Sequence, residues 1–413
     1  MRCLTSRTTS SPPRWCRPVP RRLAACVAAS LIALLPVWEP AQATQTRRHA
    51  VPSHSRQSSG DAPRVTATAA ILVDANTGQV LYDRNAHLQW PPASTTKIMT
   101  ALVALEHARL DTPIEVSRSV ARFREGTVVG LPAHAKIPLH DLLYGLLLPS
   151  GNDVALAIAE GVGGSVPAFV RLMNEKALEL GATQTHFTAP HGLYDPLHYT
   201  TAYDLSLMAR AAMQYPTFRE IVATRSWIFT PPGQRARRLF NHNRFLSRFP
   251  GADGIKVGYV HQSGHTLVAS ATRDGWRLIA VLLHSGDLYG DASRLLGLGF
   301  ARYRPTLVAS AGDSFTTLHL SGADAPVVGV VGEPIYADLA AADVVQRQLT
   351  LDDHLTLPIH RGARIGELRF YASGQLLRTV PLVSASDVHV RLHAFGFLTW
   401  ISNLSLRYRP VVF

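Results

Sequence analysis

Cysteine is scarce in this sequence, and its distribution excludes a large class of chemistry. The 413 residues include three cysteines, Cys3, Cys16 and Cys26, and none follows residue 26. The N-terminal segment has the pattern of an export signal, as described below. Once that segment is removed the protein has no thiol, which excludes a cysteine nucleophile, a disulfide and a cysteine-ligated metal site.

Charged residues are also few, at 17% against 46% hydrophobic residues, and this balance excludes long disorder as the main state. The length suffices for at least one full core and favours two domains. The formal net charge is +12, and residues 1–43 carry six arginines and one acid, so their removal leaves 12 − 5 = +7. Such a surface suits an anionic lipid or an anionic polymer such as the bacterial cell wall. We expect no nucleic-acid partner.

Long hydrophobic runs are absent except at residues 23–35, which are too short to span a bilayer comfortably. Arginines precede this run, and a small-x-small site follows it at residues 41–43. The pattern predicts a signal peptide over residues 1–43, with cleavage after Ala43. An uncleaved membrane anchor is the alternative. Polar residues 44–62 then predict a flexible leader.

The remaining chain predicts an α/β domain over residues 63–305. Short β-like runs at 69–73 and 79–82 flank a turn-rich linker, and apolar periodicity predicts helices after them. Three further β-like runs follow near the end of this region. Hairpin strands, a helical block and a returning meander predict one antiparallel sheet that joins the two ends of the domain. The predicted helices cover about 139–147, 153–161, 165–180 and 201–214, and the late strands 254–260, 265–272 and 276–284.

Residues 306–388 alternate short β-like runs with Gly, Asp and Ser turns, which predicts a small all-β domain. Residues 389–413 place apolar side chains at intervals of three and four, with arginines nearby. This is typical of an amphipathic helix on an anionic membrane surface. A terminal helix docked on its own domain is the alternative.

Ser94 and Lys97 are the first pair of candidate catalytic residues. They lie three positions apart at the start of an apolar run that predicts a buried helix, so that both side chains share one helix face. A serine hydroxyl needs a base to take its proton, and a neutral lysine can do this. Burial and a second cation both lower the pKa of a lysine. Taken alone, the pair is a weak signal, and a helix N-cap followed by a surface lysine is its more common meaning.

Two further motifs follow in the chain. Ser150 and Asn152 stand on a loop edge after an apolar run, where Ser150 can relay a proton and Asn152 can hold a substrate amide. Lys256 and Gly258 lie within the first strand of the meander, whose edge can pair with an extended peptide. Lys256 offers a positive charge to a carboxylate, and Gly258 lets a ligand approach the backbone. Each motif is ambiguous alone, and their order and separation are the specific signal.

Together these motifs resemble the low-molecular-mass penicillin-binding proteins that act as D-alanyl-D-alanine carboxypeptidases, which carry S-x-x-K, S-x-N and K-T-G signatures. The resemblance spans about residues 65–305 and includes AAILVDANTGQVLYDRNAHLQWPPASTTKIMTALVALE, LLLPSGNDVALAIAE and ADGIKVGY. It is weaker in the β-rich region and the tail. It implies a β-lactamase/transpeptidase-like fold and removal of the terminal D-alanine from peptidoglycan stem peptides. It further implies acylation by β-lactam antibiotics, no metal or organic cofactor, and a place in the periplasm on the outer face of the inner membrane.

Carried over by position, the resemblance makes Ser94 the acylated nucleophile and Lys97 its general base. It makes Ser150 and Asn152 the second wall of the active site, and Lys256 a group that helps to bind the substrate carboxylate. The backbone N–H groups of Ser94 and Tyr259 would form an oxyanion hole.

Two positions depart from the family pattern. Val257 replaces the motif's threonine and so lacks a hydroxyl that can bond the substrate carboxylate. Where the family often has an arginine near the carboxylate pocket, this sequence has Gly290 and Asp291, with Arg294 the nearest arginine. A D,D-endopeptidase of the same fold is one alternative function, and Val257 leaves open a second, a catalytically weak wall-binding protein. His186 and His191 have no metal-ligand spacing, and we expect structural roles for them.

Overall fold

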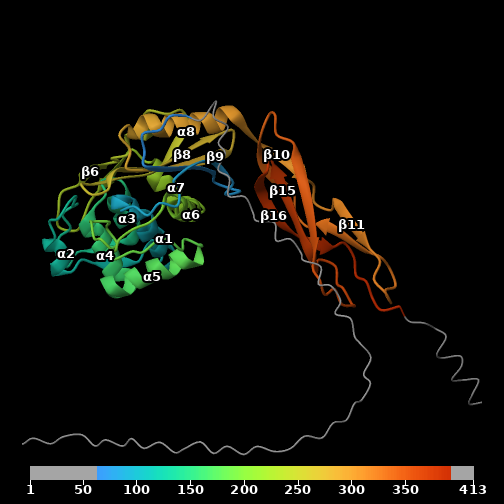
Figure 1. The fold of residues 1–413 in the computed structure, drawn as a ribbon. Helices are drawn as coiled ribbons and strands as arrows, with labels where there is room; N and C mark the ends of the chain where they lie inside the picture. The colour runs from blue at the N-terminus through green and yellow to red at the C-terminus, as the bar shows by residue number, and fades with distance from the viewer. Residues whose placement is uncertain (1–62, 392–413) are drawn as a thin grey trace, which may run out of the picture. The chain divides into compact units, whose positions relative to one another are not determined.

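A five-stranded antiparallel sheet forms the centre of the N-terminal part of the protein (Figure 1). The computed structural model describes residues 63–391. The strand order is β2-β1-β9-β8-β7, so the first hairpin pairs with the late meander through β1 and β9. The sheet therefore joins the two ends of this part of the chain, as the sequence predicts. Its strands are β1 (Ala69–Asp74), β2 (Val80–Arg84), β7 (Ala252–Val260), β8 (Gly264–Arg273) and β9 (Trp276–Leu283).

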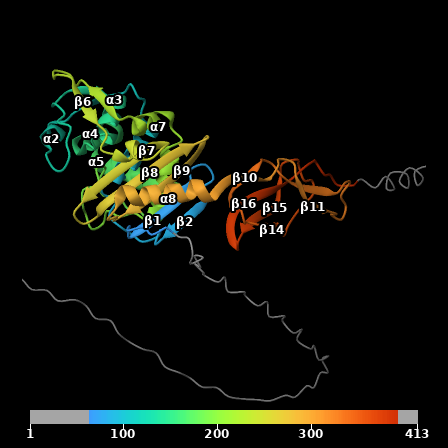
Figure 2. The same ribbon diagram turned by 90° about the horizontal axis from the view of Figure 1, so that it is seen from above.

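Helices cover both faces of this sheet, which explains why β1 is buried along its whole length. On one face α1 (Lys97–His107) and α6 (Ala202–Ala212) contribute to a large apolar cluster that includes Ile71 and Val281. On the other face α8 (Leu288–Arg302) packs against a second cluster that includes Leu72 and Leu282 (Figure 2). Residues alternate between these clusters along the strands, as the two-residue period of a strand requires.

The remaining helices form a block on the α1 side of the sheet (Figure 1). The four helices predicted from periodicity are present with small changes at their ends. Their caps fit the sequence, since Ser165 and Thr201 each accept a backbone hydrogen bond at a helix N-terminus. The block comprises α2 (Arg118–Arg122), α3 (Leu139–Leu147), α4 (Asn152–Gly163), α5 (Val166–Glu179) and α7 (Pro216–Ala223).

Several elements have no counterpart in the sequence prediction. One is α8, the helix that covers the second face of the sheet. Another is η2 (Arg244–Ser247), a turn of 3₁₀ helix just before β7. Two small hairpins border the helical block. They consist of β3 (Pro113–Glu115) with β4 (Lys136–Pro138), and β5 (Ser226–Phe229) with β6 (Arg237–Phe240).

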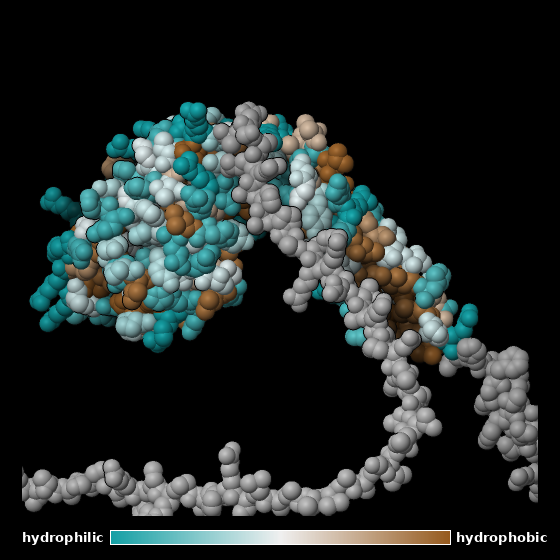
Figure 3. All heavy atoms as spheres, viewed as in Figure 1, coloured by the Kyte–Doolittle hydropathy of each residue, from teal (hydrophilic) through white to brown (hydrophobic). Residues whose placement is uncertain are grey.

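The C-terminal part is all β, as its sequence predicts. A five-stranded antiparallel sheet with the order β11-β12-β16-β15-β14 is accompanied by the pair β10-β13. Figure 3 shows hydrophobic residues gathered over this part, whereas the α/β part shows mainly hydrophilic residues in the same view. The strands are β10 (Tyr303–Ala309), β11 (Ser314–Leu318), β12 (Val327–Val331), β13 (Ile335–Ala340), β14 (Val345–Leu351), β15 (Arg364–Ala372) and β16 (Gln375–Ser384).

Three predicted segments fall wholly or largely outside the described residues: the signal peptide at 1–43, the leader at 44–62 and the amphipathic tail at 389–413. Within residues 63–391 no single helix has the length and apolar character to cross a bilayer. Helices α4 and α5 reach those limits only as a pair, and they are bent by 86° relative to each other.

Candidate active site

Ser94 and Lys97 meet as their spacing predicts. Ser94 lies in a 3₁₀ turn, η1 (Ala93–Thr96), and α1 begins directly after it at Lys97. The helix was expected to begin at about Ser94, so its first turn is tighter than predicted. Lys97 Nζ lies 3.1 Å from Ser94 Oγ, within hydrogen-bond distance. The hydroxyl and the amine are thus directly paired.

The Lys97 amine has two further oxygen partners. It donates to Asn152 Oδ1 at 2.7 Å and to the backbone carbonyl of His191 at 2.7 Å. The Lys97 side chain has no solvent exposure. Its hydrogen-bond partners within residues 63–391 are all neutral, and burial of a lysine amine among neutral acceptors favours its neutral form.

The electrostatics of the site agree with this geometry. Burial lowers the pKa of Lys97 well below its usual value, and the charge of Lys256 lowers it further, while Asp153 acts in the opposite direction. Burial also lowers the pKa of Lys256 to about 7. Burial and a second cation were the two causes expected from the sequence, and in the structure burial is the larger of the two.

Ser150 and Asn152 occupy the turn before α4. Ser150 adopts a φ of 70°, a left-handed backbone conformation that is uncommon for a residue other than glycine. Its Oγ is buried and has no hydrogen-bond partner within residues 63–391, so it is open to bond a ligand atom. Asn152 Nδ2 donates to the carbonyl of Glu125 at 3.0 Å, which directs the side-chain oxygen of Asn152 towards Lys97.

Strand β7 is the edge strand of the sheet, and its Lys256–Tyr259 segment borders the serine. Lys256 is buried, and its Nζ donates to the carbonyl of Val257 at 2.9 Å. A Cβ atom added at Gly258 would stand 2.8 Å from the backbone nitrogen of Ser94 and 2.5 Å from Thr266 Oγ1. Only glycine therefore leaves the Ser94 N–H accessible from this side. The Tyr259 side chain is 58% exposed.

The two departures from the family pattern have different places in the structure. Val257 packs against the cluster beneath α8, at the edge strand itself. Asp291 is fully buried and accepts hydrogen bonds from the backbone N–H of Thr66, from the Thr66 hydroxyl, and from Ser285 Oγ. Arg294 pairs with Asp291 and with Asp287. The Asp291 carboxylate therefore anchors the segment before β1 to α8.

Sequence reasoning missed the part played by the segment around His191. The carbonyl of this residue holds the Lys97 amine, and Gly192 follows with a φ of 83°. A Cβ at Gly192 would lie 2.0 Å from the carbonyl oxygen of Ala93. Burial lowers the pKa of His191 to about 3, so the ring is neutral. The signal available in the sequence was the Pro-His-Gly turn. It does not identify the acceptor, because every residue type has a backbone carbonyl.

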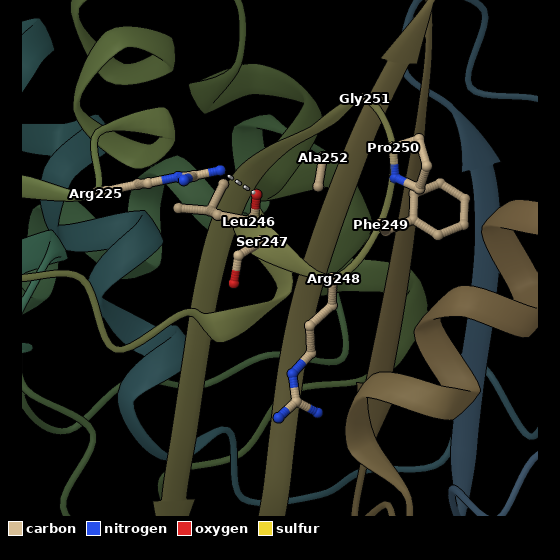
Figure 4. Close-up of a pocket in the computed structure, with 8 residues that line it drawn as sticks. All are labelled: Arg225, Leu246, Ser247, Arg248, Phe249, Pro250, Gly251 and Ala252. Atoms are coloured by element: carbon tan, nitrogen blue, oxygen red, sulfur yellow. Dashed lines mark hydrogen bonds between the residues drawn. The ribbon is translucent and has the colours of Figure 1, made fainter.

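A separate surface pocket of about 460 Å³ lies at the start of β7 (Figure 4). None of its lining residues belongs to the Ser94 cluster, so the pocket is distinct from the candidate active site. Among the described residues there is no group of three or more His, Cys, Asp or Glu side chains suited to hold a metal ion. The pocket is lined by Arg225, Leu246, Ser247, Arg248, Phe249, Pro250, Gly251 and Ala252.

Comparison with known proteins gives consistent results along the chain. Residues 56–286 match the family model described as D-alanyl-D-alanine carboxypeptidase, and residues 303–390 match that of the penicillin-binding protein 5 C-terminal domain. D-alanyl-D-alanine carboxypeptidase DacF of Bacillus subtilis is 28% identical over 82% of this chain and 88% of its own. D-alanyl-D-alanine carboxypeptidase DacC of Escherichia coli is 30% identical over 79% of this chain and 86% of its own. The crystal structure of penicillin-binding protein 5 from Haemophilus influenzae superposes with a TM-score of 0.71 at 28% identity, covering 80% of this chain and 99% of that one.

Proposed function

From the premise that this chain belongs to the D-alanyl-D-alanine carboxypeptidase family of low-molecular-mass penicillin-binding proteins, we propose that Ser94 removes the terminal D-alanine of peptidoglycan stem peptides through an acyl-enzyme. The protein is accordingly a serine-type peptidase. The observation that carries the proposal is the contact between Ser94 Oγ and the buried Lys97 amine at 3.1 Å.

The partners of Lys97 support its role as the base. A neutral amine has two N–H groups and one lone pair. The carbonyl oxygens of Asn152 and His191 only accept hydrogen bonds, so they take the two N–H groups. The lone pair is then left for the third partner, the Ser94 hydroxyl. This arrangement orients the amine to take the serine proton as Oγ attacks the carbonyl carbon.

The remaining groups surround the reacting bond. The Ser94 N–H, left accessible by Gly258, and the Tyr259 N–H stabilise the oxyanion that forms on attack. Collapse of this intermediate breaks the bond to the terminal D-alanine, whose nitrogen receives the proton through Lys97 and the unpartnered Ser150 hydroxyl. In the second half of the reaction the same base takes a proton from water, which attacks the acyl carbonyl carbon. This step breaks the ester bond, restores the Ser94 hydroxyl and releases the shortened peptide. A β-lactam carbonyl acylates Ser94 by the first of these steps.

Fluorescent penicillin labelling, together with mass analysis of D-alanine release from a pentapeptide, tests the proposal. Ser94→Ala is expected to abolish both signals. Ser165→Ala, which removes a hydroxyl at the N-cap of α5, is the matched control and is expected to retain both. Labelling that survives Ser94→Ala would refute the nucleophile assignment. Conversion of crosslinked dimers to monomers without D-alanine release would instead establish the endopeptidase.

We further propose that the protein acts in the periplasm, attached to the outer face of the inner membrane. The supporting observations are the signal-like pattern of residues 1–43 and the amphipathic pattern of residues 389–413. Deleting residues 391–413 is then expected to move the protein from the membrane fraction to the soluble periplasmic fraction. Unchanged fractionation of the shortened protein would contradict the attachment.

A further inference from the structure

Two guanidinium groups lie on the α8 side of the sheet, each over an aromatic ring of that helix. The guanidinium carbon of Arg248 lies 4.7 Å from the centre of the Tyr289 ring, and that of Arg273 lies 4.5 Å from the centre of the Phe300 ring. Tyr289 and Phe300 are eleven residues apart on α8, which corresponds to three helical turns and about 16 Å. The two charges therefore lie along one face of α8, near its two ends.

Two surface pockets meet between these charges. One is the pocket at the start of β7, which is lined in part by Arg248 and Phe249 (Figure 4). The other has a volume of about 470 Å³ and is lined in part by Arg273 and Phe300. The rings of Phe249 and Phe300 stack with their centres 6.5 Å apart, and Arg273 lies over both of them. The pockets therefore adjoin at this stack, and we call the two together the α8 groove.

The charges of the α8 groove are not balanced by the described part of the chain. Four arginines line the groove, and none of them forms an ion pair within residues 63–391. By contrast Arg294, which belongs to α8 itself, is neutralised by two aspartates. One acid, Asp274, lines the groove, and it forms no ion pair within the same range. The groove is therefore a cationic surface that is suited to an anionic ligand.

The lining of the α8 groove favours an anionic polymer over a membrane surface. A protein that lies on a bilayer inserts apolar side chains into it in addition to presenting positive charge. None of the large hydrophobic side chains that are exposed within residues 63–391 lines either pocket. The aromatic rings of the groove instead pack against the apolar cluster beneath α8. The groove thus offers guanidinium groups in a concave surface, without apolar side chains to enter a bilayer.

We propose that the α8 groove binds carboxylate groups of peptidoglycan, on parts of the polymer other than the peptide that Ser94 cuts. The inference rests on the proposed function, which makes this polymer the substrate. Its uncrosslinked stem peptides each end in a carboxylate, so one strand presents many negative charges. A guanidinium that lies over a ring keeps its edge free, where parallel N–H groups can bond both oxygens of a carboxylate.

The α8 groove is separate from the active site. Helix α1, which follows Ser94 directly, packs on the other face of the sheet. A strand that is bound in the groove therefore leaves the Ser94 cluster free to receive a peptide. The expected effect of the groove is to retain the polymer near the enzyme, with no part in the chemistry at Ser94.

Co-sedimentation with purified insoluble peptidoglycan measures this binding. The full-length protein is used in its Ser94→Ala form, so that the polymer is bound and not cut. The double variant Arg248→Gln/Arg273→Gln removes both charges and keeps the side-chain stems on their rings. The Kd should rise about ten-fold, because an exposed ion pair contributes up to about five-fold in affinity. Raising the salt concentration should weaken the binding of the parent protein more than that of the double variant.

The double variant Arg109→Gln/Arg347→Gln is the matched control. It removes the same charge at exposed positions that line neither pocket, and Arg347 also lies over an aromatic ring, that of Phe315. Its affinity for peptidoglycan should stay close to that of the parent protein. Lysine at both groove positions should restore most of the binding, because the charge returns.

Activity gives a second readout. With Ser94 intact, the glutamine variant of the groove should release D-alanine from a soluble pentapeptide with the normal kcat/KM. Its release from insoluble peptidoglycan at low polymer concentration should fall about ten-fold, in line with the weaker binding. Equal losses on the soluble peptide and on the polymer would contradict a groove that only retains the polymer.

The outcomes separate this inference from the proposed function. Unchanged sedimentation of the groove variant, or an equal loss in the control variant, would overturn the groove while the carboxypeptidase stands. A groove variant that loses binding to vesicles of anionic phospholipid but keeps its binding to peptidoglycan would identify a membrane contact and overturn the inference likewise. A natural protein that releases no D-alanine from the soluble pentapeptide and takes up no penicillin would overturn the proposed function, and this inference with it.

Discussion

Replacing Asn152 by aspartate tests whether the neutral state of Lys97 controls acylation. The substitution keeps the shape of the side chain but places a carboxylate at the position of Oδ1, which is 2.7 Å from Lys97 Nζ. At an effective dielectric of ~20, opposite charges ~3 Å apart attract by roughly 5 kcal/mol. One pKa unit corresponds to about 1.4 kcal/mol, so the pKa of Lys97 should rise by about three to four units.

The assay is the second-order rate of acylation by penicillin as a function of pH. In the natural enzyme burial, and then the charge of Lys256, lower the pKa of Lys97 and so favour its neutral form. In Asn152→Asp the base should be protonated near neutral pH. Each pH unit below the new pKa then costs a factor of about ten in rate. Raising the pH should restore the rate along a profile displaced towards alkaline pH.

Asn152→Ala is the control, since it removes the side-chain hydrogen bonds to Lys97 and to the Glu125 carbonyl without adding a charge. Its acylation rate should fall by a similar factor at every pH, with the position of the profile retained. If Asn152→Asp also gave a uniformly lower but undisplaced profile, the protonation of Lys97 would not limit acylation. The base would then have to be another group.

Three further changes follow from the contacts of the site. Gly258→Ala places a methyl group against the Ser94 nitrogen, so penicillin acylation should slow at least a hundred-fold while the urea unfolding transition changes little. A normal acylation rate would show that the oxyanion does not bind at the Ser94 N–H. Asp291→Asn should lower the free energy of unfolding by about 1–3 kcal/mol and leave acylation intact. Slower acylation with an unchanged free energy of unfolding would instead indicate that Asp291 acts in the active site. Burial lowers the pKa of Lys256 to about 7 in the folded protein from 10.5. The unfolded chain therefore binds more protons between these values, and stability should rise with pH across that window by roughly 3–5 kcal/mol. Lys256→Met should flatten the rise, and an unchanged pH dependence in this variant would assign it to other groups.

The sequence predicted those features that depend on local spacing. Ser94 and Lys97 lie three residues apart on one turn, so their contact follows from helix geometry alone. The strands of the sheet and the four periodic helices were predictable for the same reason. Placing Asn152 and Lys256 beside this pair required the resemblance to a known family, because spacing contains no information about contacts across the fold.

Other features were not predictable in this way. Helix α8 contains Gly290, Gly297 and Gly299, which weaken its intrinsic preference, and packing on the sheet stabilises it instead. The role of the His191 carbonyl was missed because any residue supplies a carbonyl. The structural role of Asp291 depends on Thr66, which is distant in the sequence but adjacent in space.

The order of strands in the central sheet has a consequence for a chain that is synthesised from its N-terminus. Strand β7 connects to β1 only through β8 and β9, so the wall that bears Lys256 has no connection to β1 until residue 283 has been added. Ser94 is made long before this point. During synthesis the hydroxyl therefore lacks the β7 wall, and a growing chain cannot react with penicillin until the last strand of the sheet is in place.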